Sequence, residues 1–569
     1  MIQFLNNYKI YYKMVHFNFL KLKILLVIFV VFGLSGFAQK NNDFEISKNL
    51  EIFTTLYRQL HLNYVDEVNS GDLMKKGIDA MLDNLDPYTV YIPESDIEDY
   101  KLMTTGQYGG VGALIHQNGE YVVISDPYEG FPAFKAGLIP GDKIIEVNKQ
   151  SAKGKSQSDI SSIFKGQPGT NLTVLIEREG ESKPIEKVLT REEIKLQNVP
   201  FSGVVGKDVG YIKLSSFTQD AGRDVKEAFL KLKDNDKVKS IIIDLRGNGG
   251  GLLQEAVNIV NIFVDKGQLV VSTKGKVSER NFSHKTIDQA IDNNIPLVIL
   301  VDKNSASASE IVSGAIQDLD RGLIVGQKTY GKGLVQNVFP VSYNAQVKIT
   351  IAKYYIPSGR CIQVIDYAHK DEDGNPGKIP DSLKTAFKTK GGRTVYDGGG
   401  IEPDLVLDPE KTSNIAISLL TKFLIFDYAN NFKRKNANIS SPREFVVTDA
   451  IYDDFLKFIT GKEYDYTTRS EKYLAELKAI AEKENYFDAI KTEYLALKDK
   501  LIHDKNADLI KNKAEIKTLI KIEIANRYFY QKGSIEASLS DDKEITKAIE
   551  LLNDSVKFQK LIGKTTSQK

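Results

Sequence analysis

The sequence is poor in metal-binding and cross-linking side chains. Its 569 residues include one cysteine, Cys361, and six histidines. A single cysteine cannot form an internal disulfide, and it excludes a structural zinc site that needs two or more cysteine ligands. The histidines are scattered without the spacing of metal ligands. We therefore expect no metal site.

An excess of charge of one sign is also missing. The chain has 76 Lys and Arg against 75 Asp and Glu, a formal net charge of +1. Proteins that bind nucleic acid usually carry a basic excess or patch, so we predict no nucleic-acid partner. With 42% hydrophobic and 27% charged residues, the chain can form ordinary cores. Its length suits three or four domains.

Long apolar runs are absent beyond the first 40 residues. Near the N-terminus, two lysines precede an apolar run over 24–32, and small residues follow at 33–38. This order is typical of a secretory signal peptide, so residues 1–38 predict export to the periplasm or cell envelope with cleavage near Ala38. The run is short for a membrane-spanning helix, which needs about 20 residues, but an uncut N-terminal anchor stays open. A second open alternative is that the protein starts at Met14 instead of Met1.

The remaining pattern predicts a multidomain α/β protein. Residues 43–104 show apolar side chains at helical spacing and form a helical N-terminal region. Residues 105–192 contain short strand-like runs separated by Gly and Pro, which predicts a small β-rich module. In 193–408, strand-like and helical segments alternate, which favours an α/β core with a mostly parallel sheet covered on both faces. Its polar segment 366–392 reads as an exposed insertion, and 409–569 as a helical C-terminal domain.

The elements expected in the α/β core have these ranges. The strands are 209–214, 240–245, 296–302, 323–326 and 401–407, and the helices are 221–232, 252–263 and 308–319.

Ser307 stands where a predicted strand ends and a helix begins. A serine at a helix N-terminus lies beside unpaired backbone N–H groups and the positive end of the helix dipole. Those groups can stabilise the oxyanion that forms when a carbonyl is attacked. However, Ser307 and Glu310 also have the spacing of a capping box, which needs no catalysis. Both interpretations stay open from this segment alone.

A serine nucleophile needs a base, and Lys332 is the candidate. Between residues 240 and 360 the only histidine is His284, in a polar stretch, so a Ser-His-Asp triad is poorly supported. A lysine can act as a base if apolar surroundings lower its pKa. The residues after Lys332 are strand-like, so Gln336 would share its face and could orient the amine. A lysine between two glycines also fits a solvated turn.

The glycine-rich segment 244–251 follows a buried strand and precedes a helix. Glycines there allow the backbone to approach a ligand closely and to present N–H groups. The spacing does not fit the dinucleotide-binding pattern Gly-x-Gly-x-x-Gly. The segment is thus a candidate for binding an oxyanion.

Three segments together resemble the tail-specific, or carboxyl-terminal processing, protease family: 244–251, 305–310 and 329–336. The resemblance implies that Ser307 is the nucleophile, Lys332 its base and Gln336 the residue that supports the lysine. It also implies an oxyanion hole formed by the backbone N–H groups of Ala308 and of a glycine, for which we choose Gly251.

Residues 105–192 resemble the PDZ module of this family. The run Gly110, Val111, Gly112 and Ala113 is similar to the loop that receives a peptide's terminal carboxylate. An extended peptide can add to an exposed sheet edge beside such a loop. The resemblance implies protein or peptide substrates with apolar C-terminal tails. A module that only scaffolds the enzyme is the alternative.

We therefore expect an exported, ATP-independent serine endopeptidase that needs no metal or organic cofactor. A catalytically silent PDZ scaffold of the envelope and an acyl hydrolase on a similar core are the alternatives. The C-terminal helices could cap the protease, bind an adaptor protein or form a homo-oligomer.

Overall fold

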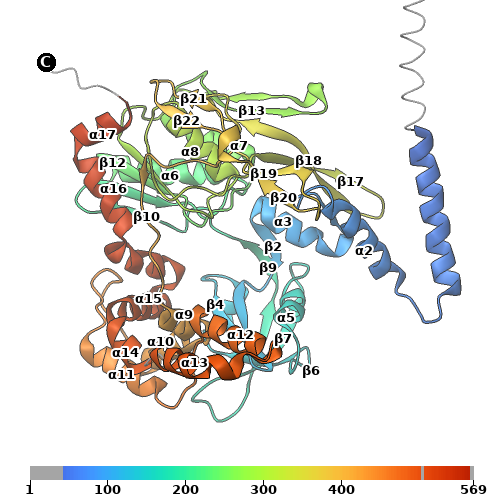
Figure 1. Cartoon of the computed structure of the whole chain (residues 1–569). Coiled ribbons are helices and arrows are strands. Elements are labelled where there is room, and N and C mark those ends of the chain that lie inside the picture. The colour runs from blue at the N-terminus through green and yellow to red at the C-terminus, as the bar shows by residue number, and fades with distance from the viewer. Residues whose placement is uncertain (1–42, 502–504, 564–569) are drawn as a thin grey trace, which may run out of the picture. The chain divides into compact units, whose positions relative to one another are not determined.

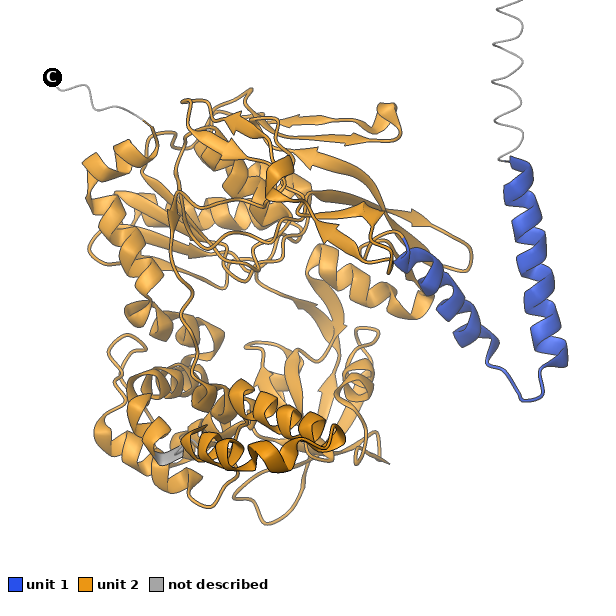
Figure 2. Cartoon of the chain, in the orientation of Figure 1, with its two compact units in different colours: residues 1–84 blue, residues 85–569 orange. Residues whose placement is uncertain are grey.

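A computed structural model describes residues 43–501 and 505–563. The chain divides into two compact units, 1–84 and 85–569 (Figure 2). The predicted signal segment 1–38 lies outside the described residues. Over the described ranges, no helix is long and apolar enough to span a bilayer.

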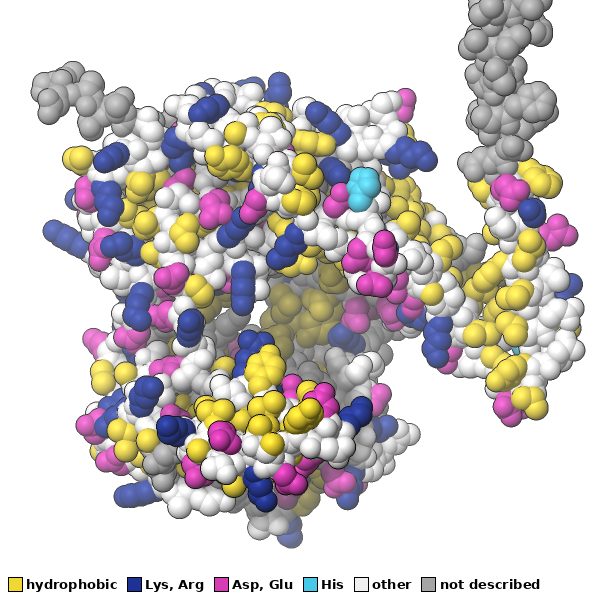
Figure 3. Space-filling view, viewed as in Figure 1, with side chains coloured by type: hydrophobic (Ala, Val, Ile, Leu, Met, Phe, Trp, Pro, Cys, Tyr) yellow, Lys and Arg dark blue, Asp and Glu magenta, His cyan; other side chains and the backbone are white. Residues whose placement is uncertain are grey.

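The first unit contains a helix over 43–63 and α2 (Ser70–Asp83), as predicted for the N-terminal region. Asn69 caps α2 because its side chain accepts hydrogen bonds from the backbone N–H groups of Gly71 and Asp72. Large apolar side chains of the 43–63 helix are exposed (Figure 3). They include Phe44, Ile46, Leu50, Ile52, Phe53, Leu56 and Leu60.

A six-stranded sheet forms the centre of the second unit, and it is mostly parallel, as predicted. Only β10 and β11 pair antiparallel; every other neighbouring pair is parallel. In spatial order the strands are β10 (Phe201–Val205), β11 (Val209–Lys213), β12 (Ser240–Asp244), β15 (Leu297–Val301), β16 (Leu323–Gly326) and β23 (Leu405–Val406). The last strand is shorter than the predicted 401–407 because only these two residues pair with β16.

Helices cover both faces of this sheet (Figure 1). On one face lie α6 (Ala221–Asp234), α7 (Leu253–Phe263) and α8 (Ala308–Asp318). The opposite face packs against α16 (Lys543–Asn553) and α17 (Ser555–Leu561), which come from the C-terminal end of the chain. Sequence periodicity showed that these helices are amphipathic, but not which surface their apolar sides cover.

A second, antiparallel sheet was not predicted from the sequence. Its long strand β18 pairs with β17, β1 and β13, and β13 pairs with β14. The strands are β1 (Val90–Ile92), β13 (Leu269–Gly275), β14 (Ser283–Lys285), β17 (Leu334–Pro340) and β18 (Gln346–Tyr355). In this sheet β18 pairs both with β17, the segment after Lys332, and with β1, which lies far away in the sequence.

The β-rich module has the predicted strands, in the order β3-β4-β5-β7-β8 with β6 paired to β5. They are β3 (Ala113–Asn118), β4 (Tyr121–Pro127), β5 (Lys143–Val147), β6 (Gln150–Ser151), β7 (Asn171–Glu177) and β8 (Ile185–Thr190), with helices α4 (Pro132–Lys135) and α5 (Gln157–Phe164). Strand β3 stands at the edge of the sheet. The short strands β2 (Gln107–Gly110) and β9 (Glu192–Lys195) pair where the module joins the core. Between β1 and β2 lie η1 (Glu94–Asp96) and α3 (Ile97–Thr105).

The polar segment 366–392 contains more regular structure than a loop. Short antiparallel pairs form between β19 (Ile365–Lys370) and β20 (Pro376–Lys378), and between β21 (Ala386–Lys388) and β22 (Thr394–Tyr396). Most of its side chains are exposed, as expected of an insertion.

Beyond residue 409 the chain is helical, as predicted. The helices are α9 (Asn414–Thr421), α10 (Leu424–Lys435), α11 (Asp449–Ile459), α12 (Arg469–Lys483), α13 (Phe487–Leu501), α14 (Lys505–Lys511) and α15 (Lys513–Ser538), followed by α16 and α17. Helices α9, α10, α11 and α15 share one apolar core. Phe423, which precedes α10, stacks on His116 of β3 with ring centroids 3.8 Å apart.

Candidate active site

Ser307 occupies a strained turn between a buried strand and a helix. It is the residue before α8, and its backbone angles are φ 55° and ψ −112°. A non-glycine residue rarely adopts such angles, and residues of this kind cluster at functional sites. A sharp strand-to-helix turn also holds the nucleophile of many hydrolases. The local geometry therefore goes beyond what a simple helix cap requires.

Two backbone N–H groups near Ser307 are available to a ligand. Within residues 43–501 and 505–563, the N–H groups of Ala308 and Gly251 make no hydrogen bond. The neighbouring Gly250 differs, because its N–H donates to the Asn248 side chain at 2.9 Å. Gly251, the glycine chosen from the sequence, thus keeps its donor free, as does Gly249, while Gly250 does not.

The glycine-rich segment is tied directly to the serine turn. The carbonyl oxygen of Asn248 accepts hydrogen bonds from Ala306 N–H at 3.1 Å and from Ser309 Oγ at 2.9 Å. The contact is so close that a Cβ atom on Gly250 would lie 2.8 Å from Ser307 Cβ and 2.6 Å from the Ala306 oxygen. Gly250 has φ 99°, which also favours glycine. These features explain why the segment needs glycine at 250.

Glu310 joins the serine turn to the lysine loop. One carboxylate oxygen, Oε2, accepts hydrogen bonds from the N–H groups of Ser307 and Lys332, both at 2.9 Å. The other, Oε1, accepts from Thr329 Oγ1 at 2.6 Å and from Gly331 N–H at 2.7 Å. The side chain is fully buried, and burial raises the pKa of Glu310 to about 7 against these four hydrogen bonds. The backbone nitrogens of Ser307 and Lys332 therefore lie within two hydrogen-bond lengths of each other.

The amine of Lys332 lies over an aromatic ring. Its Nζ is 4.1 Å from the centroid of Tyr88, a distance at which the ring face attracts a cation. Burial, helped by the positive charge of Lys348, lowers the pKa of Lys332 to about 8, whereas the carboxylates of Asp86 and Glu310 oppose this shift. Lys332 is thus partly neutral near physiological pH, as a base must be.

Within the described residues, no hydrogen bond joins Gln336 to Lys332. Strand β17 begins only at Leu334, and its register shifts between Val335 and Gln336, so the alternation of faces does not extend back to the lysine. The Gln336 amide donates to Thr350 Oγ1 at 3.1 Å, and Thr350 donates to Asp86 at 3.1 Å.

The loop predicted to bind a peptide carboxylate has two unpaired donors. Gly110 ends β2 and Ala113 begins β3. Between them, the carbonyl oxygens of Val111 and Gly112 accept hydrogen bonds from Ala133 and Tyr128, while their N–H groups have no acceptor in the described part of the chain. Because this loop leads into the edge strand β3, it has the features of a peptide site.

Within the described ranges, no three or more His, Cys, Asp or Glu side chains form a group that could hold a metal ion.

Sequence reasoning missed three residues of this site. Glu310 was interpreted only as half of a capping box, although it also binds the lysine loop. Asp86 and Tyr88 lie in the region 43–104 and were not identified as candidates for the site. Nothing in the local sequence showed that they would meet residues 332–350, because the contact depends on pairing between β1 and β18.

Three family models match the chain. Residues 208–368 match peptidase family S41, residues 123–178 match a PDZ domain, and residues 415–552 match the C-terminal helical domain of a probable PDZ-protease. The first match contains the glycine-rich segment, the serine turn and the lysine loop.

Curated relatives carry protease names. A carboxy-terminal-processing protease of Bartonella bacilliformis is 33% identical over 330 residues, which cover 57% of this chain and 75% of the relative. A probable CtpA-like serine protease of Staphylococcus aureus is 32% identical over 397 residues, covering 69% and 72%. Among solved structures, the photosystem II D1 C-terminal processing protease is 29% identical, with a TM-score of 0.35, covering 62% of this chain and 86% of its own.

Proposed function

Because the chain belongs to peptidase family S41 and is a serine-type peptidase with a PDZ domain, we propose that Ser307 and Lys332 are its nucleophile and base. The observation that carries this proposal is the Glu310 carboxylate, which binds the backbone of both residues. A second support is the pair of free N–H groups at Ala308 and Gly251.

In the proposed reaction, neutral Lys332 takes the Ser307 proton as Oγ attacks the scissile carbonyl carbon. The N–H groups of Ala308 and Gly251 stabilise the oxyanion of the tetrahedral intermediate. Lys332 then gives its proton to the leaving amine, and an acyl-enzyme on Ser307 remains. Water attacks the acyl carbon while Lys332 again accepts a proton. As the acyl–oxygen bond breaks, Lys332 returns that proton to Ser307 Oγ, and the carboxylic acid product leaves. Gln336 would act indirectly, by fixing Thr350 and Asp86 near the lysine.

Turnover of an unfolded protein substrate tests the dyad. We expect Ser307→Ala and Lys332→Ala to lower kcat by at least about 1,000-fold while the variants keep the wild-type melting temperature. Wild-type protein that cleaves no faster than the two variants would instead favour a silent PDZ scaffold.

The PDZ domain would recognise the free C-terminus of substrates with apolar tails. The peptide would pair with β3 as an additional strand at the edge of the sheet. Its carboxylate would accept hydrogen bonds from the N–H groups of Val111 and Gly112. Cleavage of two otherwise identical substrates, one ending in a carboxylate and one in a carboxamide, tests this. We expect the carboxylate form to be cleaved at least about tenfold faster at low concentration; equal rates would refute tail recognition.

Residues 1–38 would direct the protein out of the cytoplasm into the periplasm or envelope. The measurement is N-terminal sequencing of protein recovered from cell fractions. A mature start near residue 39 in the envelope fraction is expected, whereas an intact N-terminus in the cytoplasmic fraction would contradict export.

A further inference from the structure

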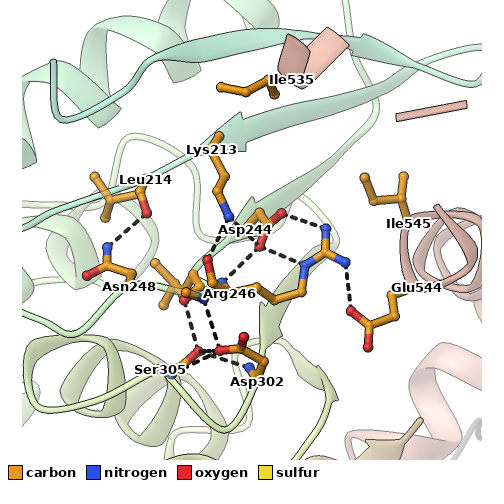
Figure 4. A network of polar contacts seen from close by, with 12 residues as sticks. Lys213, Leu214, Asp244, Arg246, Asn248, Asp302, Ser305, Ile535, Glu544 and Ile545 are labelled. Carbon is orange, nitrogen blue, oxygen red and sulfur yellow. Dashed lines mark hydrogen bonds and ion pairs between the residues drawn. The ribbon is translucent and has the colours of Figure 1, made fainter. Parts of the chain in front are cut away.

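A buried ionic network begins at the glycine-rich segment (Figure 4). Asp244, the last residue of β12, is 1% exposed and accepts from the Arg246 guanidinium at 3.0 Å and 2.7 Å. Lys213 lies 3.3 Å from the same carboxylate, and Tyr211 donates to it at 2.6 Å. Despite its burial, the pKa of Asp244 is well below its usual range because Arg246 and Lys213 stabilise the charged form.

Two further carboxylates of this network lie at the N-terminus of α16, where Asp542 is the N-cap and Glu544 is in the first turn. Arg246 Nη1 donates to Glu544 at 2.7 Å, and Nη2 lies 2.9 Å from Asp542. The side chains are 18%, 13% and 20% exposed for Arg246, Glu544 and Asp542, so these ion pairs are largely shielded from water. Ion pairs of this kind depend strongly on both partners, since loss of one leaves the other buried without a counter-charge.

The position of α16 is fixed independently of these ion pairs. Ile545, Ala548 and Leu551 on its apolar side pack into the core on the sheet face opposite α6–α8. Asp542 also caps the helix, since its carboxylate accepts a hydrogen bond from the Ile545 N–H at 2.9 Å. The acidic pair is therefore presented to Arg246 by a helix that the sheet holds in place.

The backbone of Arg246 begins the glycine-rich turn and is itself hydrogen-bonded. Its carbonyl oxygen accepts from Lys213 Nζ at 2.7 Å, and the next N–H, of Gly247, donates to Asp302 at 2.9 Å. The turn then continues through Asn248 to the free N–H of Gly251. Gly251 follows Arg246 by five residues on the same turn, so a shift of Arg246 can displace the Gly251 N–H. Displacements of about 1 Å are enough to reduce catalysis strongly.

We propose that Asp542 and Glu544 are positioning residues for the oxyanion hole, acting through Arg246 on the glycine-rich turn. This inference rests on the proposed roles of Ser307 and Gly251. It makes the C-terminal helix α16, almost 300 residues after the turn, part of the machinery that stabilises the transition state.

The test uses the full-length chain with Asp542→Asn and Glu544→Gln, singly and together. Asn remains a good helix cap, so the first change removes the charge and keeps the cap. Glu550→Gln is the matched control, because Glu550 lies on the same helix with its side chain 58% exposed and bonded to Lys547. Rates are measured per active site, titrated with a covalent serine probe, so that loss of folded protein does not count.

For the double variant we expect kcat to fall roughly 10- to 100-fold with KM changed less than about threefold. Binding of a peptide boronate, which forms a tetrahedral adduct at the serine, should weaken by a similar factor. The single Glu544→Gln variant keeps the charge of Asp542, so its kcat should lie between those of the double variant and wild type. If Asp542 and Glu544 only stabilise the fold, the double variant will have a lower melting temperature and an unchanged kcat per titrated site. That result would overturn the proposal.

Ser307→Ala, measured in parallel, separates this inference from the proposed function. If Ser307→Ala is inactive and the double variant has wild-type kcat, only the role of Asp542 and Glu544 is wrong. If Ser307→Ala keeps wild-type turnover, the nucleophile is wrong, and the oxyanion interpretation is wrong with it.

Discussion

Around Ser307 the backbone is held from several directions, whereas the side chain of Lys332 rests against an aromatic ring. On the serine side, which we define as residues 244–251 and 302–310, hydrogen bonds connect the two segments through Asn248. On the lysine side, residues 86–92 and 332–350, the amine lies over Tyr88 and has no hydrogen bond within the described residues.

This difference fits the different tasks of the two sides in catalysis. Groups that stabilise the oxyanion must already be in place when charge develops, so their backbone is fixed. The base has to accept a proton from serine and deliver it to an amine, so its side chain needs freedom to move. Glu310 keeps the two sides together by binding the backbone of each and leaving the lysine side chain free.

The largest effect should come from a change on the serine side. Gly250→Ala places a methyl group 2.8 Å from Ala308 N and Ser307 Cβ, at a φ of 99°. We expect kcat to fall by about 1,000-fold, as when an oxyanion donor is lost. Gly249→Ala is the control, because its Cβ would meet no atom within 4 Å. Similar kcat values for the two variants would show that the serine side is not rigid.

Removing the link between the sides should have the next largest effect. Glu310→Ala leaves buried donors of four residues without their acceptor, each costing about 1–3 kcal/mol. We expect the free energy of unfolding to fall by about 3 kcal/mol or more and kcat to fall roughly 100-fold. Urea denaturation and turnover provide the two measurements.

Ser313→Ala serves as its control on the same helix. Ser313 is buried and donates to the Ser309 carbonyl oxygen, away from the lysine loop. A loss of about 1 kcal/mol with normal kcat is expected. If Glu310→Ala behaves like this control, the carboxylate does not couple the two sides.

The pH dependence examines the lysine side. Since burial lowers the pKa of Lys332 to about 8, the neutral fraction of the base rises from about one tenth at pH 7 to about nine tenths at pH 9. Activity should therefore increase about tenfold over this interval, as measured by kcat/KM on one peptide substrate. A rate that is flat between pH 7 and pH 9 would contradict Lys332 as the base.

A smaller effect is expected at Lys348, whose positive charge contributes to the low pKa of Lys332. Lys348→Met should raise that pKa, shift the rising limb to higher pH and reduce kcat/KM at pH 7 by roughly two- to fivefold. Rates at pH 10 should converge with those of wild type. Lys353→Met, at an exposed position of the same strand, should leave the profile unchanged.

Much of the α/β core was predictable because its pattern is local. Buried strands such as 297–301 are continuous apolar runs, and apolar residues in the helices between the strands recur every three to four positions. The antiparallel sheet was missed, although β18 alternates Val347, Ile349 and Ile351 with polar residues, a pattern typical of a half-buried strand. The limits of the domains stay a prediction.

The sequence by itself determined the glycine-rich segment, the serine turn and the lysine between two glycines, because each depends on residues that are neighbours in the chain. Only the tertiary structure decided what surrounds them. Pairing of β1 with β18 brings Tyr88 to Lys332, and packing of α16 on the sheet brings Asp542 and Glu544 to Arg246. The physical reason is that hydrophobic burial selects which distant segments meet, and it is not directional enough for the order of residues to reveal the partner.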